Sequence, residues 1–304
     1  MPDWIQILEE INMLAPDQSD AVNIVRRKYL KALADLTGRN VIAYYSCFLH
    51  RNMDDSAISD RDKNGFMSAV YNLDRSKGLD IILHTPGGDL AAAESLVSYL
   101  RSLFGKDIRA IIPQIAMSAG TMIACSCKCL IMGKQSNIGP IDPHVRGLSA
   151  FGVIEEFEKA KKDIKKEPHC LPLWQIIIGK YPPAILGECE KAVQWSHDLI
   201  EDWLGSNMFA DDPSTSGVIA TIIERLGNPK ETKSHSRHIG IEDCVQLGLR
   251  VERLEVLIDG KDLQDAVLSV HHAYMVTLDA FPTIGKIVEN HEGAMMLIRG
   301  GDQR

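Results

Sequence analysis

The sequence predicts an α/β fold in which helices flank a mostly parallel sheet. Three observations support this: apolar segments alternate with helical segments after Leu79, turns of small residues follow two of these segments, and the composition is that of a globular domain. The chain has 304 residues, of which 45% are hydrophobic, 24% charged and 6% aromatic. A chain of this length and composition can bury a large core without disulfides or metals.

The segment before Leu79 is expected to contain amphipathic helices and one buried strand. Residues 1 to about 37 place apolar side chains at helical spacing. The segment NVIAYYSCFL (40–49) is rich in β-branched and aromatic residues, which is typical of a buried strand.

From Leu79 onwards strands and helices alternate. Strands are expected in LDIILHT (79–85), DIRAIIP (107–113) and KCLIM (128–132), with a helix in LAAAESLVSYLRSLF (90–104) and a helix start at TMIACSC (121–127). The turns TPGGD (85–89) and AMSAG (116–120) should therefore lie at the carboxyl ends of parallel strands. Ligands of open α/β sheets bind at such ends.

The second half of the chain is predicted to be mainly helical. Helices are expected in the charged segment 147–169 and in 188–209 and 216–227, followed by a loop, a short helix and a closing strand in 234–254. The tail after Gly260 is expected to be helical up to FPTIGK (281–286).

Composition also limits the functional classes. A formal net charge of −8 argues against a general nucleic-acid surface, which needs a basic stripe. The N-terminus MPDWIQILEEINML lacks the basic region of a secretory signal. The uncharged run 110–127 contains too many polar residues for a good membrane span.

Seven cysteines are an odd number, which excludes a fully paired disulfide framework and favours a reducing compartment. We therefore expect a cytoplasmic location. Cys125, Cys127 and Cys129 recur at every second residue, which is not the spacing of a structural zinc site, and His169–Cys170 is the nearby Cys/His pair. We expect these thiols to pack in the core, and we expect neither a metal nor a cofactor.

Ser118 is the candidate nucleophile. It lies in AMSAG between an apolar segment and a helix start. This motif differs from the G-x-S-x-G elbow at one position, where Ala116 replaces the first glycine. A serine hydroxyl must stand clear of its own backbone and needs a base to accept its proton. The alternative interpretation of this segment alone is a hydrogen-bonded core hydroxyl.

The motif HTPGGD (84–89) is the candidate oxyanion loop. Adjacent glycines let the backbone approach a ligand closely, and an acyl-transfer oxyanion needs two N–H donors. Gly87 or Gly88 would supply one donor and Ala119 the other; the alternative is a plain turn that opens a helix. Because 31 residues separate Gly87 from Ser118, one helix and one strand, consecutive parallel strands would place the two turns side by side.

Three motifs carry a family resemblance. ILHTPGGDLAAAESLVSYL (82–100), AMSAGTMIA (116–124) and SNIGPID (136–142) resemble the Clp protease and crotonase-like fold, which is built from repeated ββα units. More narrowly, they resemble the signal-peptide-peptidase and serine dehydrogenase proteinase group of serine peptidases. The resemblance runs from Val41 to Asp142 and continues more loosely to about Val256.

We expect three parts: an N-terminal helical segment (1–38), a Clp/crotonase-like peptidase domain (39–258) to which the resemblance applies, and a C-terminal helical tail (259–304). The resemblance leaves residues 1–38 and 265–304 uncovered. It implies that Ser118 is the nucleophile and that Gly87 and Gly88 line the oxyanion hole and bind substrate backbone. By analogy with relatives that form rings or dimers, we expect a homo-oligomer in which the helical ends and the segment WQIII (174–178) serve subunit packing.

The sequence leaves the general base open. Clp-type relatives use a histidine about 25 residues after the serine, and His144 follows Ser118 by 26 residues, although alignment through SNIGPID places Ile141 there. Signal-peptide-peptidase relatives use a lysine, which must be neutral to act as a base, so burial has to lower its pKa from about 10.4 towards 7–8.

Two lysines are candidates for that role, and each could instead be a surface residue. Lys180 follows an apolar, strand-like run and is preferred on that context. Lys191 opens a long helix, which resembles its placement in stomatin-cleaving relatives, and His144 is the third choice. The other histidines, among them His235, His238, His271 and His272, are expected to cap, pack or face solvent.

The predicted function is an ATP-independent serine peptidase that acts on peptide or protein substrates, including possible membrane-associated ones. A crotonase-type acyl-CoA enzyme is one alternative, but it needs carboxylates and no nucleophile, so Ser118 argues against it. A catalytically inactive scaffold with the same fold is the other alternative, because the base is not identified.

Overall fold

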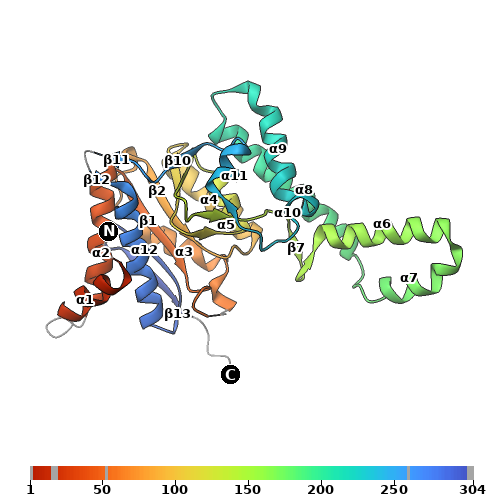
Figure 1. Cartoon of the computed structure of the whole chain (residues 1–304), viewed down its shortest axis with the longest axis horizontal. Helices are drawn as coiled ribbons and strands as arrows, with labels where there is room; N and C mark the ends of the chain where they lie inside the picture. Colours follow the sequence, from red (N-terminus) through yellow and green to blue (C-terminus); the bar gives the residue numbers. More distant parts are fainter. Residues whose placement is uncertain (1–2, 15–19, 52–53, 259–260, 300–304) are drawn as a thin grey trace.

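The structure, a computed structural model, describes residues 3–14, 20–51, 54–258 and 261–299. A seven-stranded sheet forms its centre (Figure 1). In spatial order the strands are β10 (Val251–Arg253), β5 (Leu130–Met132), β3 (Ile108–Ile112), β2 (Leu79–His84), β1 (Asn40–Ser46), β13 (Ile284–Asn290) and β14 (Met295–Arg299). The first five are parallel, and β13 and β14 form an antiparallel hairpin beside β1. The predicted α/β fold with a mostly parallel sheet is confirmed.

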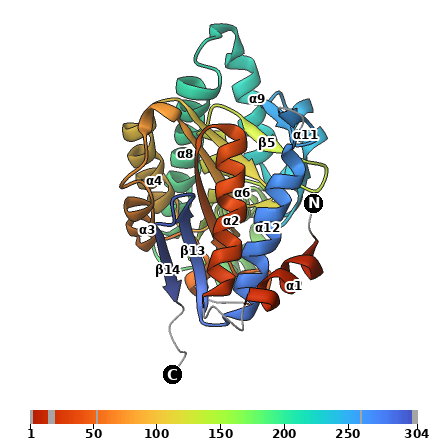
Figure 2. The same cartoon turned by 90° about the vertical axis from the view of Figure 1, so that its left-hand side faces the viewer.

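Helices cover both faces of this sheet because successive residues of a strand point to opposite sides. One face of β1, with Ile42 and Tyr44, packs under α3 (Arg61–Ala69), α4 (Leu90–Phe104) and α5 (Ala119–Cys125). The other face, with Ala43 and Tyr45, packs under α2 (Ala21–Thr37) and α12 (Leu263–Ala280), which lie side by side in Figure 2. Helix α1 (Trp4–Leu14) packs against α2 and α12. The result is three layers.

Helices α2 and α12 bury their apolar faces on the sheet of their own chain. A role of the helical ends in subunit packing stays a prediction. The structure corrects one expectation about the C-terminal end. The tail is helical up to α12, but it then continues as β13 and β14 of the central sheet. The division at residues 38 and 258 stays a prediction, and residues 259–260 lie outside the described residues.

A second, three-stranded sheet carries the turn that contains Ser118. Its strands, in spatial order, are β4 (Ile115–Ala116), β6 (Asn137–Ile138) and β9 (Ile239–Gly240). Strand β4 follows β3, and β6 follows β5, so a short strand of the small sheet comes after a long strand of the central one. Ser118 therefore follows a short strand, β4, which sequence patterns did not separate from β3.

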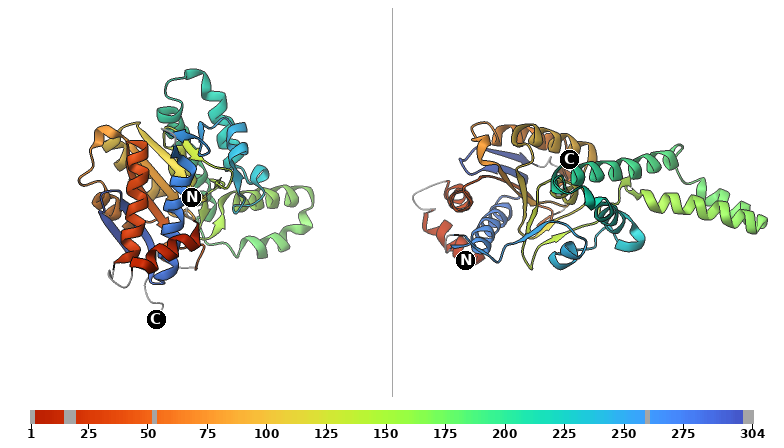
Figure 3. Two further views of the ribbon diagram at one scale, coloured as in Figure 1. Left: turned by 60° about the vertical axis from the view of Figure 1, so that its left-hand side comes forward. Right: turned by 90° about the horizontal axis from the view of Figure 1, so that it is seen from above.

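Helices α6 and α7 form an arm that projects from the body (Figures 1 and 3). The arm and its surroundings comprise the hairpin β7 (His144–Val145) and β8 (Leu148–Ser149), then α6 (Ala150–Lys166), α7 (Leu171–Ile178) and α8 (Ile185–Trp203), which leads back to the body. The segment before Lys180 was expected to be strand-like, but it is helix α7. After α8 come α9 (Ser216–Gly227), α10 (Pro229–Thr232), α11 (Ile241–Gln246) and the hairpin β11 (Leu257–Ile258) with β12 (Lys261–Asp262).

Cys125, Cys127 and Cys129 are buried in the core, as the packing interpretation predicts. Burial raises the pKa of the Cys127 thiol to about 12, so this thiol stays protonated at neutral pH. Among the described residues, every helix is too short or too polar to span a bilayer.

Candidate active site

Ser118 occupies a strained turn between β4 and α5. Its backbone angles are φ 51° and ψ −120°, a conformation that costs a residue with a Cβ atom on the order of 1–3 kcal/mol. The turn is held against the end of β2, because Met117 N–H donates to Thr85 O at 3.0 Å and Thr85 N–H donates to Ile115 O at 3.2 Å. A Cβ atom at Gly120 would lie 2.5 Å from Thr85 Cγ2, so only glycine fits there. This is the geometry of a nucleophile elbow.

The glycine pair lies directly beside this elbow. Gly87 has φ +94°, and a Cβ atom on it would lie 2.6 Å from Ser118 Cβ. The predicted proximity of the two turns is therefore confirmed. The backbone of Ile58 packs directly against Gly88, because a Cβ atom on Gly88 would lie 2.3 Å from Ile58 N. Both positions require glycine because backbone or side-chain atoms occupy the space of a side chain.

Two backbone N–H groups at this turn are available to a ligand. Gly87 N–H already donates to Thr85 Oγ1 at 3.2 Å. Gly88 N–H has no acceptor within the described part of the chain. Ala119 is the first residue of α5, so its N–H has no partner inside the helix. Gly88 and Ala119 are thus the donor pair that remains.

A cavity of about 580 Å³ opens in front of Ser118. Met122, Ile141 and Trp195 supply part of an apolar wall, from α5, the segment after β6, and α8. The polar groups around the cavity are those of the elbow and the glycine pair, together with Asp89, Asp142, His144, Arg146, Ser196 and His235.

Asp142, His144 and His235 form one cluster in this cavity. The Asp142 carboxylate is 3% exposed, and its Oδ1 lies 2.8 Å from His235 Nδ1. The rings of His144 and His235 meet edge to face with their centroids 4.2 Å apart. Partial desolvation and the neighbouring His235 lower the pKa of His144, and Asp142 opposes this shift. His144 is therefore neutral at neutral pH and able to accept a proton.

The two candidate lysines lie elsewhere in the single chain. Lys180 follows α7 on the projecting arm and is exposed. Lys191 is on α8 and is also exposed, although its neighbour Ala192 lines the cavity. Within the described residues, the cavity lining includes His144 but neither lysine. The structure thus brings together Ser118, Gly87, Gly88, Ala119 and His144 of the residues predicted from sequence.

Sequence reasoning missed two residues that line this cavity and one that supports it from behind. Asp142 ends the motif SNIGPID but was assigned no role, and His235 was expected to cap, pack or face solvent. Lys286 is fully buried in β13, where its Nζ lies 2.6 Å from Asp62 and donates to Ala57 O at 2.7 Å. It thereby anchors the segment at Ala57, which lines the cavity. No local signal marks His235 or Lys286, since each is far from Ser118 in the sequence.

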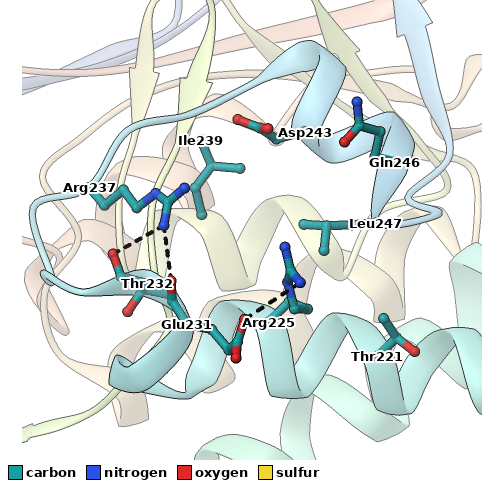
Figure 4. A pocket seen from close by; sticks show the side chains of 9 residues that line it. All are labelled: Thr221, Arg225, Glu231, Thr232, Arg237, Ile239, Asp243, Gln246 and Leu247. Carbon is teal, nitrogen blue, oxygen red and sulfur yellow. Dashed lines mark hydrogen bonds and ion pairs between the residues drawn. The ribbon is translucent and has the colours of Figure 1, made fainter.

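A second cavity of about 210 Å³ lies beside the loop that carries His235 (Figure 4). Arg237 points towards α10 and donates to Glu231 O at 2.9 Å and to Thr232 O at 3.5 Å. Arg225 pairs with the Glu231 carboxylate at 3.5 Å. Both arginines that line this second cavity are thus paired with neighbouring groups. Arg237 joins the loop that carries His235 to α10 through its hydrogen bonds.

The fold and the serine elbow define a Clp-like serine peptidase architecture, and sequence comparison gives the family. The model of the ClpP-like SDH-type serine proteinase family matches residues 16–178, which is just over half of the chain, and the chain belongs to this family. The matched range contains Ser118, the glycine pair and His144, and it ends before Lys180.

Two archaeal relatives share part of this region. The uncharacterized protein MJ0137 of Methanocaldococcus jannaschii is 28% identical over 160 residues, which cover 50% of this chain and 54% of the relative. The uncharacterized protein MJ1495 of the same organism is 30% identical over 110 residues, or 36% of this chain and 37% of the relative. The chain thus spans about half or less of the length of these curated relatives.

Among solved structures, the chain resembles a Ser-to-Ala mutant of the 1510-N membrane-bound stomatin-specific protease. The TM-score is 0.37 and the identity 16%, over 68% of this chain and 86% of that one.

Proposed function

We propose that this chain is an ATP-independent serine endopeptidase whose nucleophile is Ser118. One observation carries the proposal: a single cavity contains a serine on a strained elbow, two available N–H donors and a histidine pair beside a buried carboxylate. Family membership supports the reaction class, because the family is one of serine proteinases.

The chemistry follows from these positions. Ser118 Oγ attacks the peptide carbonyl carbon, and its proton passes to an imidazole. The oxyanion that forms accepts hydrogen bonds from Gly88 and Ala119 N–H, and each such donor contributes about 3–4 kcal/mol of barrier reduction. The imidazolium then protonates the leaving amine, an acyl-enzyme remains on Ser118, and water resolves it.

We propose that the base belongs to the cluster of Asp142, His144 and His235. A histidine base needs a partner that fixes its tautomer, and the contact of 2.8 Å between Asp142 Oδ1 and His235 Nδ1 supports that role. The lysine base predicted from the sequence, Lys180 or Lys191, remains the rival. A lysine base needs a desolvated amine, and both side chains are exposed in the single chain. The lysine mechanism therefore requires a second copy of the chain or a movement of the arm.

The substrates are peptides or proteins, with membrane-associated proteins among them, and the peptidase acts as a homo-oligomer. Exposed apolar side chains on α7 support an interface on the arm: Leu173 is 58% and Ile176 66% exposed. The apolar wall with Met122 and Trp195 supports recognition of an apolar substrate side chain.

The test is covalent labelling by a fluorophosphonate probe, with casein degradation followed in parallel. We expect labelling and degradation by the wild type and neither by Ser118→Ala. Absence of labelling in the wild type would contradict a serine hydrolase. Labelling that persists in Ser118→Ala would contradict the assignment of the nucleophile. Circular dichroism of both proteins shows that the comparison is between folded chains.

A further inference from the structure

The cluster of Asp142, His144 and His235 also has the composition and spacing of an open metal site. One ligand atom from each residue, a carboxylate oxygen and two imidazole nitrogens, lies within 4.8 Å of the others. Asp142 is buried, whereas the side chain of His235 is 34% exposed and His144 faces the cavity more openly. The cluster therefore has one buried ligand, Asp142, and an open side that a metal ion can reach from the cavity.

The distances suit a small transition-metal ion. Zinc binds histidine nitrogen and carboxylate oxygen at about 2.0–2.2 Å, so the ligand atoms of a tetrahedral site lie about 3.4 Å apart. The contact of 2.8 Å between Asp142 and His235 is shorter than this, and the limit of 4.8 Å for the cluster is longer. Small side-chain rotations would bring all three atoms to metal-binding separation.

The types of ligand favour zinc and its neighbours over calcium or magnesium. Two imidazoles with one carboxylate suit Zn²⁺, Co²⁺ and Ni²⁺, whereas the hard cations prefer all-oxygen sites. Three protein ligands leave the fourth position of zinc open, as in sites that bind water or a substrate group. Since the cluster lines the cavity of Ser118, that position would face the same cavity.

The backbone around the cluster supports such a site. His144 begins the tight hairpin β7–β8, in which Arg146 and Gly147 have φ values of 54° and 80°. His235 sits on the loop that Arg237 ties to α10 (Figure 4). The two histidines thus come from separate anchored segments that converge on Asp142.

We propose that Asp142, His144 and His235 bind one Zn²⁺ ion and that this ion inhibits the peptidase by occupying the histidines. The metal-binding part of this proposal rests on the ligand geometry alone. Inhibition rests on the proposed function, because it requires one of these histidines to be the base for Ser118. Zinc and proton acceptance compete for the same imidazole nitrogens, so the zinc-bound chain would be unable to activate Ser118.

A second group of donors provides a built-in control. Glu167, His169 and Cys170 also place one ligand atom each within 4.8 Å, but they lie near the junction of α6 and α7 and come from one short segment. Replacing His169 by alanine and Cys170 by serine removes these donors without touching the cavity. All metal titrations use this background, after removal of any histidine tag.

Binding is tested with Co²⁺ alone, followed by its visible absorption, and with Zn²⁺ as competitor. The protein also carries Ser118→Ala, so peptidase activity plays no part. We expect saturable binding of one Co²⁺ that Zn²⁺ displaces. In His144→Ala, His235→Ala and Asp142→Ala the affinity should fall by on the order of 100-fold or more, since loss of a ligand's supporting partner alone costs about 10- to 100-fold. Affinity unchanged in these variants, or no saturable binding, would overturn the site.

Inhibition is tested on the chain with Ser118 intact, by the rate of fluorophosphonate labelling with and without Zn²⁺. We expect labelling to slow at least about tenfold at saturating Zn²⁺ and to recover with EDTA. Labelling at an unchanged rate by the zinc-loaded chain would overturn inhibition while the metal site stands. A chain that binds Co²⁺ but never labels would instead contradict the proposed peptidase, so the two failures are distinguishable.

Discussion

Two buried carboxylates, Glu289 in the sheet and Asp142 in the cavity, use the same chemical group in different ways. Glu289 on β13 is fully buried and saturated with donors. Its oxygens accept from Arg26 Nε at 2.6 Å, Arg27 Nε at 2.8 Å and the Tyr274 hydroxyl at 2.8 Å. Asp142 is almost as buried, but its recorded partner is His235, and the cluster around it opens into a cavity.

The difference separates a structural carboxylate from one that is available for chemistry. The charge of Glu289 is neutralised by the fully buried guanidinium of Arg26 and the partly exposed one of Arg27, so this group stabilises the packing of α2 and α12 on the sheet. Asp142 contacts a group that can change its protonation state or its partner. Burial alone therefore does not identify a functional carboxylate; the partner and the access of solvent do.

The largest effect is expected from Asp142→Asn. Loss of the carboxylate removes the group that orients His235, and in a Ser-His-Asp triad such a change lowers turnover by on the order of 10⁴-fold. We expect the rate of fluorophosphonate labelling to fall by about 10²- to 10⁴-fold while the melting temperature changes little. Labelling at the wild-type rate would place Asp142 with Glu289 as a structural group.

Glu289→Gln should produce the opposite pattern. It leaves the buried Arg26 guanidinium without its counter-charge, and breaking a buried pair from one side costs about 3–5 kcal/mol. Urea denaturation should show this loss in the free energy of unfolding. The folded fraction should still label at close to the wild-type rate, because Glu289 does not line the cavity. A stability equal to that of the wild type would contradict the structural role.

The free energy of unfolding should fall at acidic pH because of His84, which is buried at the end of β2. Burial lowers the pKa of His84 to about 4, from an ordinary value of 6.5, although two acceptor oxygens, Ser46 O and Gln114 Oε1, lie within hydrogen-bond distance of its ring nitrogens and favour the protonated form. Between these two values the unfolded chain binds the proton and the folded chain does not, so stability is complete above pH 6.5 and falls towards pH 4.

The loss attributable to His84 is about 3 kcal/mol. Its ring also faces His271, whose pKa burial lowers well below the ordinary value, and His50 lies nearby. Urea denaturation at several pH values between 7.5 and 4.5 measures the effect. His84→Gln should flatten the pH dependence in this window; an unchanged slope would show that other groups cause it.

The smallest effect is expected from relieving the strain at Ser118. Glycine adopts φ 51° and ψ −120° without the steric cost that a Cβ atom incurs, so Ser118→Gly should be more stable than Ser118→Ala by about 1 kcal/mol. Neither variant should label with the probe. If Ser118→Ala were the more stable of the two, the strained elbow would not describe the protein in solution.

The fold was largely predictable because its strands and turns follow simple patterns. Apolar strands with small-residue turns predicted β2, β3, β5 and the contact between Gly87 and Ser118. The hairpin β13–β14 was missed because Lys286, Glu289 and Asn290 are buried polar residues, which mask the apolar pattern of a strand. The apolar run of α7 does not distinguish a helix from a strand, because a short apolar run fits either type.

The site was only half predictable from sequence. The elbow and the glycine pair are local motifs, so the sequence shows them directly. His235 reaches the cavity from a loop 117 residues after Ser118, held there by Arg237 and by its contact with Asp142. That placement depends on tertiary packing, which no spacing rule conveys. The preference for Lys180 depended on the apolar, strand-like run before it, which is helix α7 in the structure.

The most direct test of the account compares four single replacements by alanine, at His144, His235, Lys180 and Lys191. The rate constant of fluorophosphonate labelling is measured for each, with circular dichroism as the control for folding. We predict a loss of about 100-fold or more in at least one of the histidine variants and wild-type rates in both lysine variants. Wild-type labelling by both histidine variants, or loss of labelling in a lysine variant, would contradict the histidine cluster as the base for Ser118.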